Sequence, residues 1–157
     1  MNSFYIDTVC SDVSAFSSGY NVFDKYLQSG GHPAVIHYVF ESESDRLIAY
    51  FSLLASAMLI GDPSKLNVAS AIEVEMFAID EKFRGTGLSI ELLDAVVKTI
   101  KNYKEEYVGA DIAILYSVPV EYVISLYEKM GFRRATGGLT AFKSDFTNGC
   151  VPMYMAI

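Results

Sequence analysis

Apolar residues recur with two different periods along the chain, and these periods predict strands and helices. Strand-length runs of β-branched and aromatic residues lie at 3–9, 34–40, 46–59, 71–79, 112–116, 133–142 and 151–157. Helical spacing or helix caps lie at 11–16, 22–28, 88–100 and 119–130. The clearest helix repeats Leu88, Leu92, Val96 and Ile100 on one stripe, the pattern of a helix packed on a sheet. The order of elements predicts an α/β fold with a mixed, mostly antiparallel central sheet and about four flanking helices.

Length and composition indicate one globular domain spanning residues 1–157. The chain has 157 residues, 52% of them hydrophobic, which is enough to bury a substantial core and too few for a second domain. The formal net charge is −7. This charge disfavours nucleic acid as a partner and favours a cationic substrate such as an amine, polyamine or basic peptide.

Cysteine and histidine usage predicts no metal site. Cys10 and Cys150 lie near opposite ends of the chain, and His32 and His37 do not complete a ligand set. We expect two reduced thiols in a cytoplasmic protein. The sequence has no basic, then apolar leader pattern at its start and no apolar run long enough to cross a membrane.

The chain is organised around residues 71–93, where a predicted strand meets a helix through an Arg-Gly-Thr-Gly turn. Such a turn exposes amide N–H groups at the positive end of the helix dipole, and this arrangement binds anions. Each hydrogen bond from such an amide to a phosphate oxygen contributes about 1.5–3 kcal/mol. The stretch therefore predicts a pyrophosphate site, although two glycines before a helix more often form only a tight turn. A nucleotide P-loop signature (G-K-[ST]) is absent from the sequence.

Three further features, together with the turn, resemble the GNAT superfamily of acetyl-CoA-dependent N-acyltransferases. The strand MFAID precedes the turn, the helix LLDAVV follows it, and LYEKMGF (Leu126 to Phe132) arrives some forty residues later, as in that family. The resemblance covers residues 34–157. It implies two central strands that splay apart and acetyl-CoA as co-substrate, with no metal.

The family's cofactor-binding motifs can be carried over residue by residue. Its Q/R-x-x-G-x-G/A loop matches Arg84, Gly85, Thr86, Gly87, Leu88 and Ser89, whose backbone amides would hold the CoA pyrophosphate. Ser89 stands where the family prefers Gly or Ala, and serine is small enough to keep the phosphate close. Phe77, Ala78 and Ile79 match the strand end that pairs with the pantetheine arm like an added strand.

Two residues match catalytic positions of the family. Tyr127 corresponds to its tyrosine in the Y-E-K-x-G-F context, which would protonate the leaving thiolate. Glu73 corresponds to the general base of histone-acetylating members, which would deprotonate the acceptor amine. Glu75, two residues on, shares the strand face expected for Glu73, and either carboxylate could simply attract a cationic amine.

The family pattern leaves several functions open. Val120 replaces an Asn that bonds pantetheine in many members, which leaves room for an acyl-CoA-binding sensor without turnover. FDKYL and RLIAYFSLLAS also resemble the toxin branch that acetylates aminoacyl-tRNA, but that branch needs a basic surface. We expect an N-acetyltransferase acting on a primary amine of a small molecule or peptide. The apolar C-terminal strand could pair with the same strand of a second copy of the chain and so form a homodimer.

Overall fold

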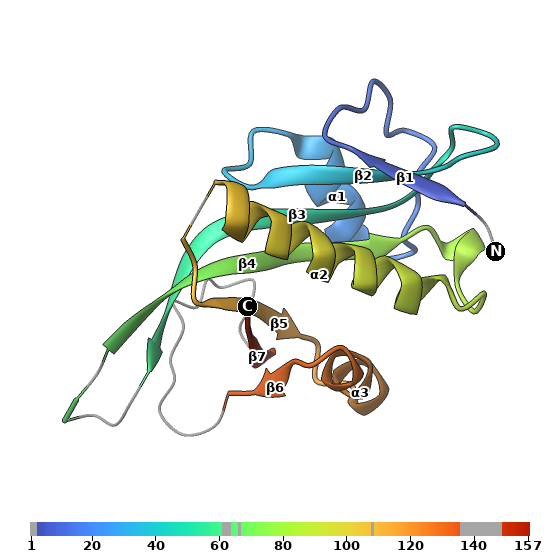
Figure 1. Cartoon of the computed structure of the whole chain (residues 1–157). Helices are drawn as coiled ribbons and strands as arrows, with labels where there is room; N and C mark the ends of the chain where they lie inside the picture. The colour runs from blue at the N-terminus through green and yellow to red at the C-terminus, as the bar shows by residue number, and fades with distance from the viewer. Residues whose placement is uncertain (1–2, 61–63, 66, 108, 136–148) are drawn as a thin grey trace. The chain divides into compact units, whose positions relative to one another are not determined.

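The computed structural model describes residues 3–60, 64–65, 67–107, 109–135 and 149–157. The strands are β1 (Phe4–Asp7), β2 (Val35–Glu41), β3 (Leu47–Ile60), β4 (Asn67–Ile79), β5 (Ile112–Ser117), β6 (Arg133–Arg134) and β7 (Val151–Ala156). The helices are α1 (Asn21–Ser29), α2 (Leu88–Glu106), α3 (Glu121–Lys129) and the short 3₁₀ helix η1 (Glu81–Phe83) (Figure 1). The mixed α/β class predicted from the sequence is confirmed, with three α-helices instead of about four among these residues.

The strands form one seven-stranded sheet in the order β1-β2-β3-β4-β5-β7-β6. Pairing is antiparallel from β1 to β2 and from β2 to β3, and it is antiparallel again from β5 to β7 and from β7 to β6. β4 and β5 pair in parallel, from Ala71↔Ile112 to Val74↔Leu115. This ladder ends at Val74, although β4 continues to Ile79.

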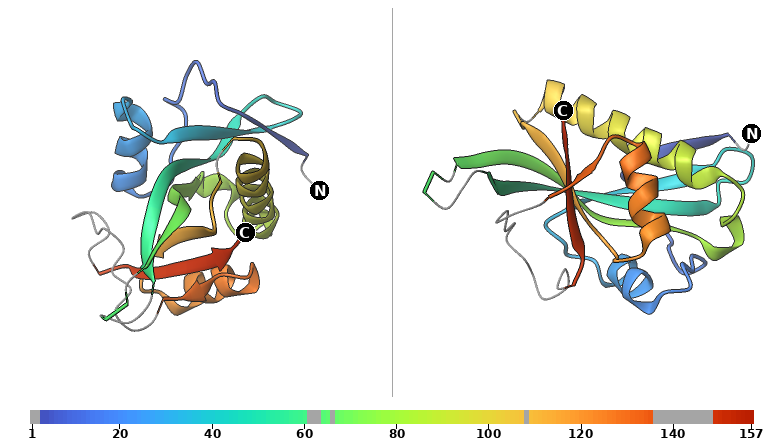
Figure 2. Two further views of the ribbon diagram at one scale, coloured as in Figure 1. Left: turned by 60° about the vertical axis from the view of Figure 1, so that its left-hand side comes forward. Right: turned by 90° about the horizontal axis from the view of Figure 1, so that it is seen from below.

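The chain divides into two compact units, and each is described here by itself. The first unit comprises Met1–Leu54 and Glu75–Leu92. Its core cluster consists of Phe16, Leu27, Leu47, Tyr50, Met76 and Ala78. Helix α1 lies beside β2 and β3 and contributes Phe23, Tyr26 and Leu27 to this packing, as their helical spacing predicts (Figure 2).

The second unit comprises Ala55–Val74 and Leu93–Ile157. Its core cluster consists of Met58, Ala69, Ala71, Ile112 and Ile114, with Tyr154 and Ala135 packed against it. Strand β5 is buried along nearly its whole length, which agrees with its uninterrupted apolar run. β3, β4 and α2 each contribute residues to both units. The expected extent of the domain, residues 1–157, stays a prediction.

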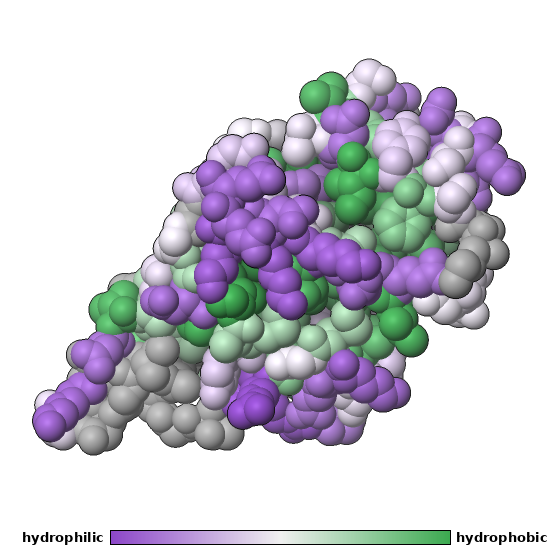
Figure 3. Space-filling view, viewed as in Figure 1, coloured by the Kyte–Doolittle hydropathy of each residue, from purple (hydrophilic) through white to green (hydrophobic). Residues whose placement is uncertain are grey.

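Helix α2 carries the apolar stripe that its sequence predicts. Leu88, Leu92, Val96 and Ile100 are all buried. The opposite face exposes Asp94 and Lys98, which form an i, i+4 ion pair at 2.7 Å. Figure 3 shows hydrophilic side chains along this outward face of α2. The helix is therefore amphipathic over its length.

Four expectations about the elements need correction or lie outside the described residues. The segment 11–16 forms no helix, because the Asp12 carboxylate accepts the Ser14 amide N–H at 2.8 Å and closes a local turn instead. Pro119 precedes the helix it was expected to start, since Val120 is its extended N-cap. The strand expected at 133–142 is seen as β6 at Arg133–Arg134, and its residues 136–142 lie outside the described residues. The polar stretch Lys143–Gly149 predicts a turn, and residues 143–148 of it also lie outside the described residues.

The C-terminal strand is paired within the chain. β7 bonds β5 along its whole length and β6 at Arg133 and Arg134. One edge of β7 is therefore paired along its length by β5, and the other is paired by β6 at Met153 and Tyr154. A homodimer formed through this strand stays a prediction.

Candidate functional site

The turn between β4 and α2 has the geometry of an anion-binding loop. Gly85 and Gly87 adopt φ values of 75° and 83°, which disfavour residues with a Cβ. A Cβ added at either glycine would have no neighbouring atom within 4 Å. The surface above both glycines is therefore open on the side where a Cβ would point.

The backbone amides of this loop are available to a ligand. Within the described part of the chain, no hydrogen bond uses the amide N–H of Gly85, Thr86, Gly87, Leu88 or Ser89 as donor. The Arg84 amide differs, because it donates to Glu81 O at 3.4 Å, and the Thr86 hydroxyl donates to Phe83 O at 2.8 Å. Five successive donors thus lie at the N-terminus of a 19-residue helix. This arrangement suits a phosphate group.

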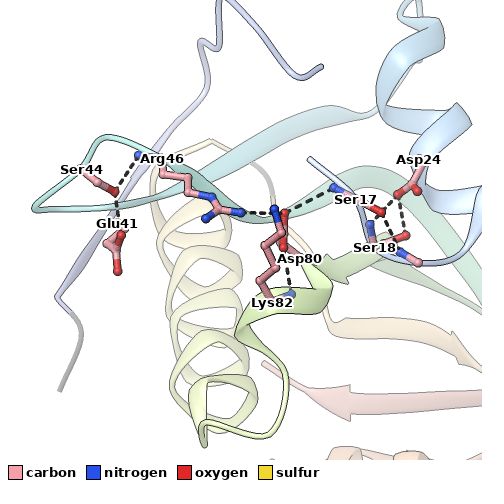
Figure 4. Close-up of polar contacts among 9 residues, drawn as sticks. Ser17, Ser18, Asp24, Glu41, Ser44, Arg46, Asp80 and Lys82 are labelled. Atoms are coloured by element: carbon pink, nitrogen blue, oxygen red, sulfur yellow. Dashed lines mark hydrogen bonds and ion pairs between the residues drawn. The ribbon is translucent and has the colours of Figure 1, made fainter. Parts of the chain in front are cut away.

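A buried carboxylate fixes the entry to this loop. Asp80 is 1% exposed, and its carboxylate accepts the amide N–H of Lys82 at 3.0 Å and that of Ser17 at 3.4 Å. Arg46 Nη2 lies 3.6 Å from Asp80 Oδ2 (Figure 4). The Asp80 backbone amide donates to Ile48 O at 2.8 Å. The end of β4 is therefore held before the glycine turn begins.

The strand residues expected to contact the cofactor belong to the first unit. Ala78 and Ile79 are buried, and Phe77 is half-buried. They follow the point where the β4–β5 ladder ends, at Val74↔Leu115. This segment of β4 runs directly into the loop at Asp80, so the strand residues and the loop amides are continuous in the chain.

The two residues expected to be catalytic belong to the second unit. Glu73 is half-buried on β4 and pairs in register with Ile114. Burial raises the pKa of Tyr116, two residues further along β5, to about 12, and the charge of Glu73 adds to this shift. The two groups are thus near enough for their charges to interact.

Tyr127 lies on α3 with a half-buried side chain packed edge-to-face on Phe132, the ring centroids 6.2 Å apart. Burial raises the pKa of the Tyr127 phenol to about 12. Among the described residues, no hydrogen bond contributes to this shift. Tyr127 is therefore a neutral hydrogen-bond donor at physiological pH, and a weaker acid than an ordinary phenol.

Glu75 is held by a residue that the sequence pattern assigned only to the core. The Tyr26 hydroxyl of α1 donates to Glu75 Oε2 at 2.6 Å and lies 3.1 Å from Ser52 Oγ. Ser52 is fully buried and accepts the Met76 amide N–H at 3.1 Å. The spacing of Phe23, Tyr26 and Leu27 predicts a helix face but carries no signal for this hydroxyl contact.

The described residues contain no group of three or more His, Cys, Asp or Glu side chains placed to hold a metal ion. In the same residues, no helix combines the length and apolar character needed to span a membrane.

Comparison with known proteins relates the chain to an enzyme family. A family model described as an acetyltransferase (GNAT) domain matches residues 18–148. No curated protein matches the chain in sequence.

Solved structures share the fold at low sequence identity. A bacterial toxin superposes with a TM-score of 0.77 at 17% identity, covering 100% of this chain and 92% of the toxin chain. AtaTR bound with AcCoA gives a TM-score of 0.68 at 14% identity, covering 99% of this chain and 94% of the matched chain. AtaT complexed with acetyl-methionyl-tRNAfMet gives a TM-score of 0.70 at 15% identity, covering 93% of this chain and 98% of the AtaT chain. At these identities the likeness concerns the fold.

Proposed function

Because the chain belongs to the GNAT family of acetyltransferases, we propose that it transfers an acetyl group from acetyl-CoA to the nitrogen of a primary amine. The observation that carries the proposal is the run of five amides, from Gly85 to Ser89, that no described carbonyl occupies. Together with the dipole of α2, they suit the CoA pyrophosphate. Phe77, Ala78 and Ile79 would pair with the pantetheine arm through their backbone.

The proposed reaction needs a base and an acid. An alkylammonium must lose a proton before its nitrogen can attack the thioester carbonyl, and Glu73 or a water molecule would accept that proton. The new C–N bond replaces the C–S bond, and the sulfur leaves as a thiolate. Tyr127 would donate its phenolic proton to that sulfur, and the second proton that the nitrogen loses as the amide forms would restore the phenol. Its raised pKa keeps it protonated throughout the physiological range.

We further propose that the acceptor is a cationic amine of a small molecule or peptide. The net charge of −7 supports this, because an acidic surface attracts cations and repels polyanions. A second candidate acceptor is an aminoacyl-tRNA. Its support is the fold shared with AtaT, which was solved with acetyl-methionyl-tRNAfMet. The charge favours the first acceptor.

Acetyl-CoA titration followed by thiol release tests the proposal. We expect calorimetric binding of acetyl-CoA, followed by amine-dependent release of free CoA thiol over a panel of diamines, polyamines and lysine-containing peptides. A separate experiment offers aminoacyl-tRNA as the acceptor, at low and at physiological salt, and measures the same thiol release. Binding without release for any acceptor would identify an acyl-CoA sensor, and absence of binding would refute both roles.

A further inference from the structure

The Arg84 guanidinium contacts a segment that lies far from it in the sequence. Its Nη2 donates to Ser18 O, and its Cζ lies 4.8 Å from the centroid of the Tyr20 ring in a cation–π contact. Both partners belong to the segment Ser17–Tyr20, more than sixty residues earlier in the chain. The side chain of Arg84 is therefore engaged with this entry segment of α1.

The backbone around Arg84 holds the same entry segment. The Glu81 amide N–H donates to Ser17 O at 2.9 Å, and the Ser17 amide donates to Asp80 Oδ2 at 3.4 Å. Gly19 adopts a φ of 71°, and a Cβ there would lie 3.1 Å from Glu81 Oε2. The left-handed backbone favours glycine at this position, and a Cβ there would require only a shift of the Glu81 side chain.

The entry segment in turn fixes the first turn of α1. Tyr20 is the N-cap residue of the helix. The Ser18 amide and hydroxyl lie 2.8 Å and 2.6 Å from Asp24 Oδ1, and Asp24 stands in the first turn. A displacement of Arg84 therefore reaches α1 through two successive sets of hydrogen bonds.

We propose that Arg84 is a positioning residue that couples the anion-binding loop to the start of α1. This inference rests on the proposed function, because the ligand of the loop is taken to be CoA. A ligand bound to the amides of residues 85–89 restricts the backbone that carries Arg84. That restriction keeps the guanidinium on Ser18 O and Tyr20, so that cofactor binding also orders the entry of α1. The guanidinium itself is not a phosphate ligand.

Hydrogen exchange of the amides of residues 17–24, measured with and without CoA, tests the coupling. In the parent protein we expect CoA to slow their exchange severalfold. In Arg84→Ala we expect exchange of these amides without CoA to rise about tenfold and the CoA-dependent slowing to disappear. The Kd for CoA should change less than threefold, because the loop amides remain. Loss of overall stability alone would not remove the CoA effect while binding is retained.

Three variants serve as matched comparisons. Lys82→Ala removes the same charge from an exposed side chain in the same segment and should behave as the parent does. Arg84→Lys keeps a donor for Ser18 O but loses the planar stacking on Tyr20, so partial rescue is expected. Tyr20→Leu removes the aromatic partner, and its effect should not add to that of Arg84→Ala.

Two results would overturn the inference. A tenfold or larger weakening of CoA binding in Arg84→Ala, absent in Lys82→Ala, would make Arg84 a phosphate ligand. Unchanged exchange of residues 17–24 in Arg84→Ala would show that the contact positions nothing. If the parent protein bound no CoA, the proposed function and the coupling would fail together, while exchange without CoA would still decide whether Arg84 holds the entry of α1.

Discussion

The Tyr26 hydroxyl donates a 2.6 Å hydrogen bond to Glu75 Oε2, joining helix α1 to strand β4 across 49 residues of sequence. Tyr26 also stacks on His32, with ring centroids 3.7 Å apart. Burial and the hydrogen bond to Glu75 raise the pKa of Tyr26 above its ordinary value. A neutral phenol bonded to a half-buried carboxylate therefore stabilises the first unit.

Tyr26→Phe is expected to lower the free energy of unfolding by about 2 kcal/mol, because a hydrogen bond to a charged group is lost inside the protein. The measurement is urea denaturation at neutral pH, with an unchanged m-value. Tyr5→Phe is the matched control, since Tyr5 donates a 3.0 Å hydrogen bond to Asp45 at the surface. The control should change stability by less than about 0.5 kcal/mol. Equal effects of the two substitutions would contradict the stabilising role of Tyr26.

Gly87→Ala is expected to weaken acetyl-CoA binding at least tenfold. The new methyl group would project from the loop where a phosphate must approach the amides, although no protein atom lies within 4 Å of it. The left-handed backbone adds a stability cost of about 1 kcal/mol. Calorimetric titration and thermal unfolding measure the two effects separately.

Gly30→Ala is the control for this substitution. Gly30 has a φ of 62° and likewise has no atom within 4 Å of an added Cβ, but it lies at the C-terminal end of α1. It should lower stability, because its φ of 62° and ψ of −179° suit glycine alone, and leave acetyl-CoA binding unchanged. Equal binding by Gly87→Ala and the parent would exclude the loop as the phosphate site.

The sequence predicted the elements that local patterns determine. The α2 stripe of Leu88, Leu92, Val96 and Ile100 and the apolar run of β5 each occur where expected, because burial against a sheet demands those periods. The prediction of a helix at 11–16 was wrong. There the Asp12 carboxylate accepts the Ser14 amide N–H in a local turn, which competes with helix formation. Propensity alone does not decide between these two uses of an aspartate.

The contacts around the loop could be predicted only in part. Glycines directly before a helix, such as Gly85 and Gly87, allow backbone amides without intrachain partners to be predicted from local sequence alone. The contact of Arg84 with Tyr20 has no local signal, because it depends on a pairing across 64 residues. Tyr26 is similar, since its position in an apolar stripe conceals the role of its hydroxyl.

Alkaline pH is expected to destabilise the protein from about pH 10 upward. Burial raises the pKa values of Tyr26, Tyr50, Tyr116 and Tyr127 in the folded protein, while unfolded tyrosines titrate near 10. Between pH 10 and 12 the unfolded chain therefore binds fewer protons than the folded one, and the free energy of unfolding falls as pH rises. Urea denaturation at pH 8, 10 and 11 measures this. A constant free energy of unfolding over that range would contradict the raised pKa values of these tyrosines.

Tyr127→Phe is expected to lower kcat for acetyl transfer about a hundredfold or more while the KM for acetyl-CoA stays within about twofold, because the hydroxyl acts only as the sulfur departs. Since burial raises the Tyr127 pKa to about 12, kcat of the parent should show no loss attributable to this phenol between pH 7 and 10. Tyr122→Phe is the matched control, since Tyr122 lies on the same helix and is 75% exposed, and it should retain parental kcat. Parental turnover by Tyr127→Phe across this pH range would assign thiolate protonation to water or to another group, and would leave Tyr127 a packing residue against Phe132.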